Sequence, residues 1–388
     1  MRSLCALVVV AACAGGRAAH TTMPSPATTP ARDLAAARPA QPTDAHLVAK
    51  DPRIVDLDII RITASSRGVG GDPELEHVAT ADLFKEATDA AKAGQTERAI
   101  SAYKRITTEF PDSKFAPVSL FNIAAIYDTR GDLTATISTL RDLVKAYPGS
   151  RESIEGHLYI AALQSDHNQF ADALATLEEV LARPSLTYAD RIEAFARKGY
   201  VLIELRRYPD ALPVLDAAVA EWRKAPHLDD PYYIAMASYY RGELAHRKFT
   251  EAPVRLPDDQ LIADLEAKRV LAVQAYDRWK ESLGFKQAYW ATAAGYQMSQ
   301  IFVELWEAHV KAPYPRRIDA ATRAKYVTEV HGRVREHLEK ALEGHRMNVE
   351  LAKAYGVETQ WSKASAARAT EVMETLAREA AGTYVKPD

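Results

Sequence analysis

An internal period of 37 residues constrains the fold of this chain more than any other feature. The pattern Ala87, Gly94, Ala99, Tyr103 and Pro111 recurs as Ala124, Gly131, Thr136, Leu140 and Pro148, then as Ala161, Asn168, Ala173, Leu177 and Ser185, and with a shift of 38 as Gly199, Arg206, Ala211 and Leu215. Each copy holds two helical patterns joined by a short polar turn, and one such unit cannot bury its apolar face alone. The period therefore predicts stacked helical hairpins over residues 80–224.

The repeated positions are of the types that helix packing requires. The first helix carries a small residue, such as Ala87 or Gly199, where two helices would cross closely. The second carries a large one, such as Tyr103, which we expect to fill the gap to the next unit. Gly94 and Gly131 suit the left-handed residue after a helix C-terminus. Proline at the repeat junctions prevents helix continuation. An all-α fold follows.

This pattern resembles the tetratricopeptide repeat over residues 80–220. The junctions Phe110-Pro-Asp-Ser113 and Tyr147-Pro-Gly-Ser150 resemble those of envelope proteins of the BamD and CpoB types. Residues 225–388 lose the period but keep long helical patterns, and they resemble the C-terminal regions of myxobacterial envelope repeat proteins such as the gliding-motility lipoprotein GltE. The resemblance implies a helical-hairpin solenoid whose enlarged C-terminal hairpins cap the array, because an open end exposes apolar surface.

Composition and motifs argue against several functional classes. The formal net charge is −3, without the positive excess that phosphate-backbone binding needs, so we expect no nucleic-acid partner. The only cysteines, Cys5 and Cys13, rule out a disulfide framework or thiolate metal site in the folded body. Phosphate-loop, His-Glu-x-x-His and Gly-x-Ser-x-Gly motifs are absent. We expect no enzyme activity, no cofactor and no metal.

The N-terminus has the pattern of an export signal and a lipid anchor. Residues 1–12 form a short apolar signal peptide ending Val-Ala-Ala before Cys13, which resembles the lipobox of bacterial lipoproteins. In that family the cysteine is lipidated. Residues 13–52 form a tether rich in Pro, Ala and Thr, a composition that cannot bury enough surface to fold. We expect an outer-membrane lipoprotein facing the periplasm; an ordinary secretory signal, giving a soluble periplasmic protein, is the alternative.

Residues 53–79 combine a short apolar segment with a glycine-rich loop. Residues 53–63 partly alternate apolar and polar side chains, as a strand does. Two interpretations remain open: the segment adds to the sheet edge of a partner, or it packs along the first helices of its own chain.

The family pattern assigns a partner groove to the inner face of the hairpins. The residues at those positions are Phe84, Thr88, Phe121, Asn122, Ala125 and Tyr200. Lysines of the basic clamp by which some tetratricopeptide proteins bind a C-terminal carboxylate are missing here. An apolar or mixed segment of a partner would suit this face better.

Aromatic residues gather in the C-terminal half. The candidate aromatic surface consists of Tyr232, Tyr239, Tyr289, Trp290 and Tyr296. Tyr and Trp dominate binding hot spots, so these residues could line a site for a peptide or a glycan strand; packing between long helices is the alternative interpretation.

Together these features predict a lipid-anchored, non-catalytic scaffold or adaptor that binds other envelope proteins or peptides. Motility, outer-membrane assembly and envelope maintenance are the candidate machines. The alternative function is a periplasmic glycan- or peptidoglycan-binding module that uses the aromatic half.

Replacing Cys13 tests the predicted anchor. Intact-mass analysis of the protein from its own cells should show the mass of acyl chains on Cys13, because two or more chains anchor a protein stably. Cys13→Ala should lose both that mass and the association with membranes. An unlipidated Cys13 in the unmodified protein would contradict the prediction.

Overall fold

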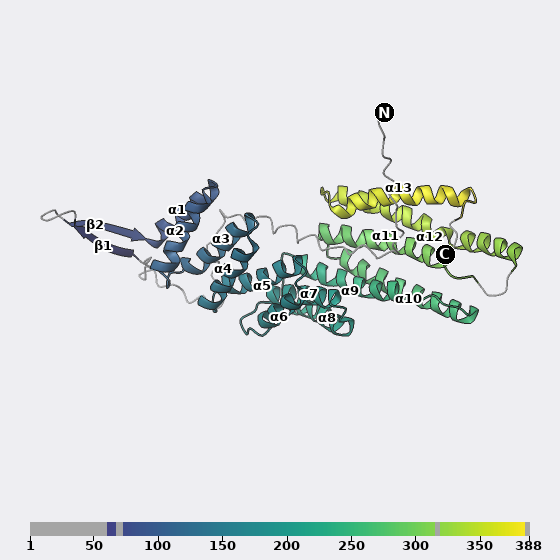
Figure 1. The fold of residues 1–388 in the computed structure, drawn as a ribbon, viewed down its shortest axis with the longest axis horizontal. Helices are drawn as coiled ribbons and strands as arrows, with labels where there is room; N and C mark the ends of the chain where they lie inside the picture. The colour runs from purple at the N-terminus through teal and green to yellow at the C-terminus, as the bar shows by residue number, and fades with distance from the viewer. Residues whose placement is uncertain (1–59, 67–72, 315–318, 385–388) are drawn as a thin grey trace, which may run out of the picture. The chain divides into compact units, whose positions relative to one another are not determined.

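The computed structural model describes residues 60–66, 73–314 and 319–384, with side chains from Ala79 onward. Cys13, the tether and residues 53–59 lie outside these residues. The described part contains a β-hairpin followed by thirteen helices (Figure 1). The predicted helical-hairpin fold is therefore confirmed.

The helices follow one another through short turns. Their bounds are α1 Thr80–Lys92, α2 Thr96–Glu109, α3 Phe115–Thr129, α4 Leu133–Ala146, α5 Arg151–Asp166, α6 Phe170–Leu181, α7 Tyr188–Glu204, α8 Tyr208–Lys224, α9 Tyr232–Glu251, α10 Asp258–Leu283, α11 Ala288–Val310, α12 Ala320–Ala354 and α13 Gln360–Ala380. The predicted copies correspond to the pairs α1/α2, α3/α4, α5/α6 and α7/α8. Residue 225, where the period is lost, lies between α8 and α9.

The chain divides into two compact units. Unit 1 holds the chain up to Gly156 together with Leu163–Gln169, and unit 2 holds His157–Ala162 and the chain from Phe170 onward. The division falls inside α5.

Strands β1 (Ile60–Ser66) and β2 (Pro73–Ala79) precede α1 as an antiparallel pair, with Ile60 opposite Ala79 and Ser66 opposite Pro73. The strand-like segment expected from the sequence, residues 53–63, overlaps β1 at residues 60–63, and these residues pair with β2, which the sequence analysis does not predict.

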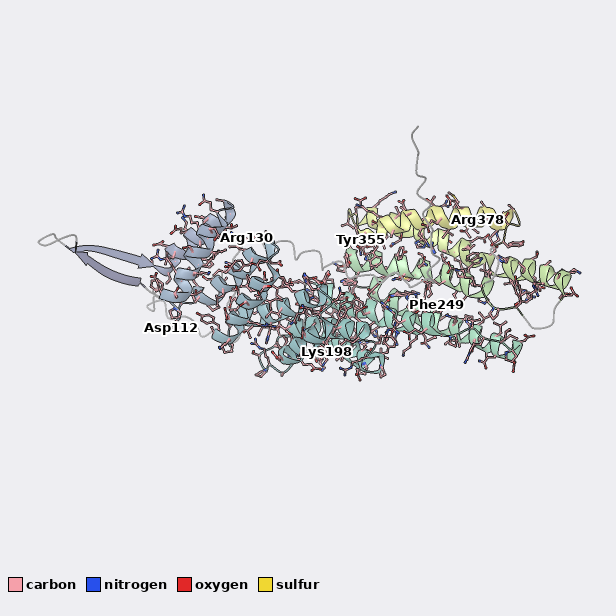
Figure 2. The ribbon with its side chains drawn as sticks, in the orientation of Figure 1. Asp112, Arg130, Lys198, Phe249, Tyr355 and Arg378 are labelled. Carbon is pink, nitrogen blue, oxygen red and sulfur yellow. The ribbon has the colours of Figure 1, made fainter. Side chains whose placement is uncertain are left out.

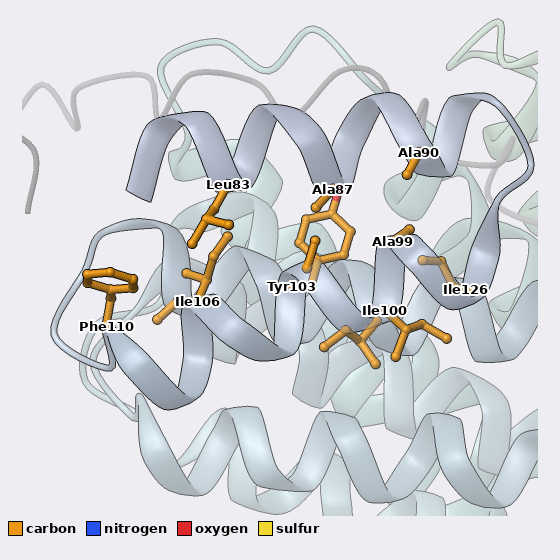
Figure 3. Packing of buried hydrophobic residues seen from close by; sticks show 12 residues of the cluster. Leu83, Ala87, Ala90, Ala99, Ile100, Tyr103, Ile106, Phe110 and Ile126 are labelled. Atoms are coloured by element: carbon orange, nitrogen blue, oxygen red, sulfur yellow. The ribbon is translucent and has the colours of Figure 1, made fainter. Parts of the chain in front are cut away.

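The core of unit 1 forms where α1 crosses α2. Ala87 on α1 and Tyr103 on α2 are both fully buried, and the Tyr103 ring points at α1 beside Ala87 (Figure 3). Leu83, Ile100 and Ile106 extend the same core. The small residue thus lets the large one lie between the two helices.

In unit 2, glycine takes the small position. A Cβ atom on Gly199 of α7 would clash with the Leu215 side chain of α8, so Leu215 packs against the first helix of its own hairpin. A Cβ atom on Gly242 of α9 would likewise clash with the Trp279 ring of α10. Packing this close leaves no room for a methyl group at either glycine.

The turns between paired helices confirm a second prediction. Gly94 and Gly131 have φ of +72° and +75°, the left-handed region that favours glycine. At the equivalent positions of the third and fourth copies, Asn168 and Arg206 adopt φ of 59° and 58°. The turn geometry is therefore repeated even where glycine is not.

Helices α11, α12 and α13 pack beside one another in unit 2 (Figure 1). Gly295 on α11 lies against Asn348, and Gly344 on α12 lies against Ser299, so these two helices approach closely. Among the described residues, none of the helices combines the length and the hydropathy that crossing a bilayer requires.

A buried charge cluster links α7, α9 and α11. His246 Nε2 lies 2.6 Å from Glu304 Oε2, and Arg247 donates to Glu243 at 2.9 Å and to Glu204 at 3.3 Å. Burial alone would lower the pKa of His246, but Glu304 and Glu243 outweigh it and raise that pKa to about 10. The imidazole is therefore charged at neutral pH.

A lysine and a tryptophan complete this part of the core. Lys268 on α10 donates to the backbone carbonyl of Phe249 at 2.5 Å (Phe249 is labelled in Figure 2). The Trp279 ring lies 5.4 Å from the His246 ring, between centroids. Paired charges, rather than apolar side chains alone, therefore fill this part of the core, which follows the regular repeats in the chain.

Alanine at Gly199 tests the close crossing of α7 and α8. Gly199→Ala should lower the stability of the protein by about 1–3 kcal/mol, because the added methyl group overpacks the core. The matched control is Gly332→Ala, at an exposed position of α12 where an added Cβ atom would have no neighbour within 4 Å. Because alanine favours a helix more than glycine does, this variant should raise the stability of the protein by up to about 1 kcal/mol. Thermal melts of both variants measure this, and equal melting midpoints would contradict the account.

The pH dependence of stability tests the His246 cluster. Since the pKa of His246 is raised from 6.5 to about 10 in the folded state, its stabilisation is fully present below pH 6.5 and is lost as pH rises through 10. Between pH 6 and 10, the melting midpoint of the unmodified protein should fall towards that of His246→Gln. His227→Gln, whose side chain is 84% exposed, is the control and should track the unmodified protein. Parallel curves for His246→Gln and the unmodified protein would show that the cluster contributes no such stabilisation.

Candidate protein-binding surface

Three of the predicted groove residues meet at Tyr103 in unit 1. Asn122 Nδ2 donates to the Tyr103 hydroxyl at 3.1 Å, and Thr88 Oγ1 lies 3.2 Å from the same oxygen. Phe84 packs edge-on against the Tyr103 ring at 5.7 Å and stacks on Phe115 at 4.9 Å. Burial raises the pKa of Tyr103, so its hydroxyl stays protonated.

This arrangement corrects the predicted groove in part. Thr88 and Asn122 are 8% and 7% exposed, and they satisfy a buried hydroxyl rather than face a ligand. Phe121 and Ala125 are half-buried on α3. Tyr200 belongs to unit 2, where it is buried against Tyr240 with ring centroids 4.9 Å apart. The six residues therefore do not lie in one compact unit.

The candidate aromatic surface is also only partly exposed. Tyr239 and Trp290 are 4% and 3% exposed, and Gln297 Nε2 donates to the Tyr239 hydroxyl at 3.2 Å. These two side chains belong to the core, which corrects their assignment to a surface. Tyr232, Tyr289 and Tyr296 are half-buried. Tyr296 packs with His345 and Trp361, at 5.3 and 5.5 Å between ring centroids.

Tyr232, Tyr233 and Tyr289 form a half-buried group that we call the aromatic ledge. The Tyr232 ring lies 5.1 Å from Tyr233 and 6.5 Å from Tyr289. Trp290 packs under it, 5.6 Å from Tyr232 and 5.0 Å from Tyr289. The ledge is thus seated on a fully packed indole.

Two helix starts place the ledge. Pro231 immediately precedes α9, so Tyr232 and Tyr233 occupy its first turn. The side chain of Gln287 caps α11 by accepting a hydrogen bond from the Trp290 amide at 2.9 Å, which puts Tyr289 in the first turn of that helix.

An ion pair beneath the ledge orients Tyr233. Arg197 on α7 is 5% exposed; it donates to Glu193 at 2.9 Å and to the Tyr233 hydroxyl at 2.9 Å. Its guanidinium also lies 5.2 Å from the centre of the Tyr233 ring, within cation–π range. Tyr232 and Tyr289 are among the residues predicted from the sequence, whereas Tyr233 and Arg197 are not. The adjacent Tyr-Tyr pair is a sequence signal for Tyr233, and no sequence signal points to Arg197.

The hydroxyls of the ledge stay protonated over the physiological range, and the hydroxyl of Tyr233 is held by the buried Arg197. Burial raises the pKa of Tyr232 and of Tyr233 well above 10, and that of Tyr289 to about 12. The ledge therefore combines flat apolar rings with neutral polar tips. Over the residues that the structure describes, no group of three or more His, Cys, Asp or Glu side chains is arranged to hold a metal ion.

Comparison with known proteins identifies the repeats. Residues 74–225 match the family model described as a tetratricopeptide repeat-like domain. No curated protein sequence matches the chain significantly.

Several solved structures are similar to this chain at low sequence identity. A tetratricopeptide repeat protein from Parabacteroides merdae is 17% identical, with 71% of this chain and 97% of that chain covered and a TM-score of 0.34. The apo form of RapI is 13% identical, with 71% of this chain and 97% of that chain covered and a TM-score of 0.38. The kinesin light chain repeats of Podospora anserina are 14% identical, with 50% of this chain and 94% of that chain covered and a TM-score of 0.35.

The family model and the observed helical hairpins both indicate tetratricopeptide-like repeats. The chain carries a tetratricopeptide-like domain within a helical solenoid, a fold that generally serves as a non-catalytic scaffold for binding proteins or peptides.

Proposed function

We propose that this protein is a non-catalytic, lipid-anchored scaffold that captures a protein partner in a bacterial cell-envelope machine. The tetratricopeptide-like repeats supply the scaffold. The lipobox-like sequence before Cys13 supports the anchor and the periplasm-facing position at the outer membrane. Motility, outer-membrane assembly and envelope maintenance are the machines to which the sequence resemblance points.

The aromatic ledge is the observation that carries the binding role. Three tyrosines at the starts of two helices keep part of their surface exposed, although Trp290 and the Arg197–Glu193 pair hold them from below. Rigid tyrosines bind at a low cost in side-chain entropy, and such residues dominate binding hot spots. A pre-organised ledge of this kind suits a protein or peptide partner.

The charges around the ledge indicate what kind of partner fits. Glu193 neutralises Arg197, and the guanidinium is buried, so it is not presented to a ligand as an open cation. The exposed carboxylate of Asp230, which accepts a hydrogen bond from the Tyr232 amide at 2.9 Å, adds a negative charge beside the ledge. The ledge therefore favours an apolar or mixed segment over an acidic one.

A periplasmic glycan- or peptidoglycan-binding module is the second candidate. The rings of Tyr232 and Tyr289 are within 28° of parallel, and flat aromatic faces also accept sugar rings. This function would use the same ledge without a protein partner.

Substitution of Tyr289 separates these functions. In native envelopes, chemical crosslinking should join the protein to a partner, and Tyr289→Leu should reduce that product at least tenfold, the effect of losing a hot-spot residue. The control is Tyr326→Leu, a half-buried tyrosine near the N-terminal end of α12 and away from the start of α11, which should leave the product unchanged.

Two results would contradict the proposal. One is the absence of any protein crosslink that depends on Tyr289. The other is binding to purified sacculi that Tyr289→Leu abolishes while no protein product forms, which would favour the glycan-binding module.

A further inference from the structure

Beneath the aromatic ledge, an arginine is held between a carboxylate and a tyrosine ring. Arg197 donates to Glu193 at 2.9 Å, and its guanidinium lies 5.2 Å from the centre of the Tyr233 ring. A guanidinium suits such a pair of groups because its flat face packs on an aromatic ring while its N–H groups point at the carboxylate. Lysine, with a compact ammonium group, cannot do both in this way.

The same arrangement occurs a second time on α7. Arg191 pairs with Glu221 at 2.5 Å, and its guanidinium lies 4.8 Å from the centre of the Tyr188 ring. Both examples belong to unit 2, as does the ledge. A carboxylate beside a tyrosine ring is therefore an arginine-binding arrangement that this unit already uses within its own fold.

The ledge presents these two groups at its surface without an arginine. The exposed Asp230 carboxylate accepts a hydrogen bond from the Tyr232 amide at 2.9 Å, which fixes it beside the half-buried Tyr232. Across the residues that the structure describes, no lysine or arginine pairs with Asp230 or lies over the Tyr232 ring. The preceding Asp229, whose side chain is 98% exposed, adds a second carboxylate and lies 3.2 Å from His227.

The electrostatic surroundings of Tyr232 favour a cation. Burial raises the pKa of Tyr232, and Tyr289, Glu193 and Asp230 raise it further, whereas Arg197 lowers it. A negative charge that disfavours the ionised phenol also attracts a cation and repels an acidic side chain. The Arg197 guanidinium does not supply that cation at the surface, because it is buried and already paired with Glu193.

We propose that the aromatic ledge recognises an arginine side chain of its protein partner, with the guanidinium on the exposed part of the Tyr232 ring and paired with the Asp230 carboxylate. Apolar side chains of the same partner segment would contact Tyr289. This inference rests on the proposed function and deepens it, because it names the side chain that anchors the partner.

Two peptides that differ in one group test the inference. The probes are acetyl-leucyl-arginyl-leucine amide and the same tripeptide with citrulline, which keeps the planar shape of arginine but carries no charge. NMR titration follows isotope-labelled tyrosine rings in the full chain with Cys13→Ala, and Tyr232→Phe identifies the Tyr232 signal. The arginine peptide should shift that signal with a dissociation constant about tenfold lower than that of the citrulline peptide, because an exposed ion pair and a cation–π contact each contribute a factor of a few.

A charge-neutral variant gives the decisive comparison. Asp230→Asn removes the charge but keeps a side-chain oxygen that can accept from the Tyr232 amide, so it should remove most of the preference for arginine without disturbing the start of α9. The matched control is Asp259→Asn, at an exposed aspartate in the first turn of α10, which should keep the preference. Equal affinities for the two peptides, a preference that survives Asp230→Asn, or an unshifted Tyr232 signal would each overturn the inference.

The outcome is separable from that of the proposed function, which Tyr289→Leu tests in native envelopes. If the ledge does not distinguish the two peptides but the envelope crosslink still depends on Tyr289, the arginine anchor is wrong and the scaffold role stands. If the ledge prefers the arginine peptide but no envelope crosslink depends on Tyr289, the arginine site stands and the scaffold role is wrong.

Discussion

Each helical hairpin depends on a small residue in its first helix that admits a large one from its second. Ala87 with Tyr103 and Gly199 with Leu215 are separated by the same sixteen residues, and all four are almost fully buried. The contact sets how closely the helices approach, and hence how much apolar surface each hairpin buries. A larger residue at the small position would force them apart, at a cost in packing that the rest of the hairpin cannot recover.

The long helices also pair a small residue with a large one, but here the neighbouring side chains are charged. In α9 and α10 the pair is Gly242 with Trp279, and the space beside it holds His246 with its two carboxylate neighbours. Burying charges is costly unless they are paired, and here each cation of the cluster has a carboxylate or carbonyl partner. The middle of α9 is thereby fixed, and its first turn, with Tyr232 and Tyr233, is held in place at the surface.

Much of this fold could be predicted from the sequence, because the repeat encodes it locally. The turn residues Gly94, Gly131, Asn168 and Arg206 all take the left-handed conformation that their place in the period implies. The candidate site could be predicted less well. A spacing of seven puts Tyr232 and Tyr239 on one helical face, but it does not tell which end of that face another helix covers. Residues more than fifty positions away decide this, because Trp290 and Gln297 cover Tyr239 whereas Tyr232 keeps part of its surface exposed. The polar contacts of Tyr103 were missed for the same reason, since Asn122 comes from the next hairpin.

The central claim is that the ledge at the start of α9 and α11 contacts a polypeptide. Photocrosslinking from the ledge tests it most directly, with benzoylphenylalanine placed at position 289 and, as a control, at the exposed position 332 of α12. In native cells, irradiation should give an adduct to another protein from position 289 and none from position 332. Equal products from both positions, or adducts to glycan strands alone from position 289, would contradict the account.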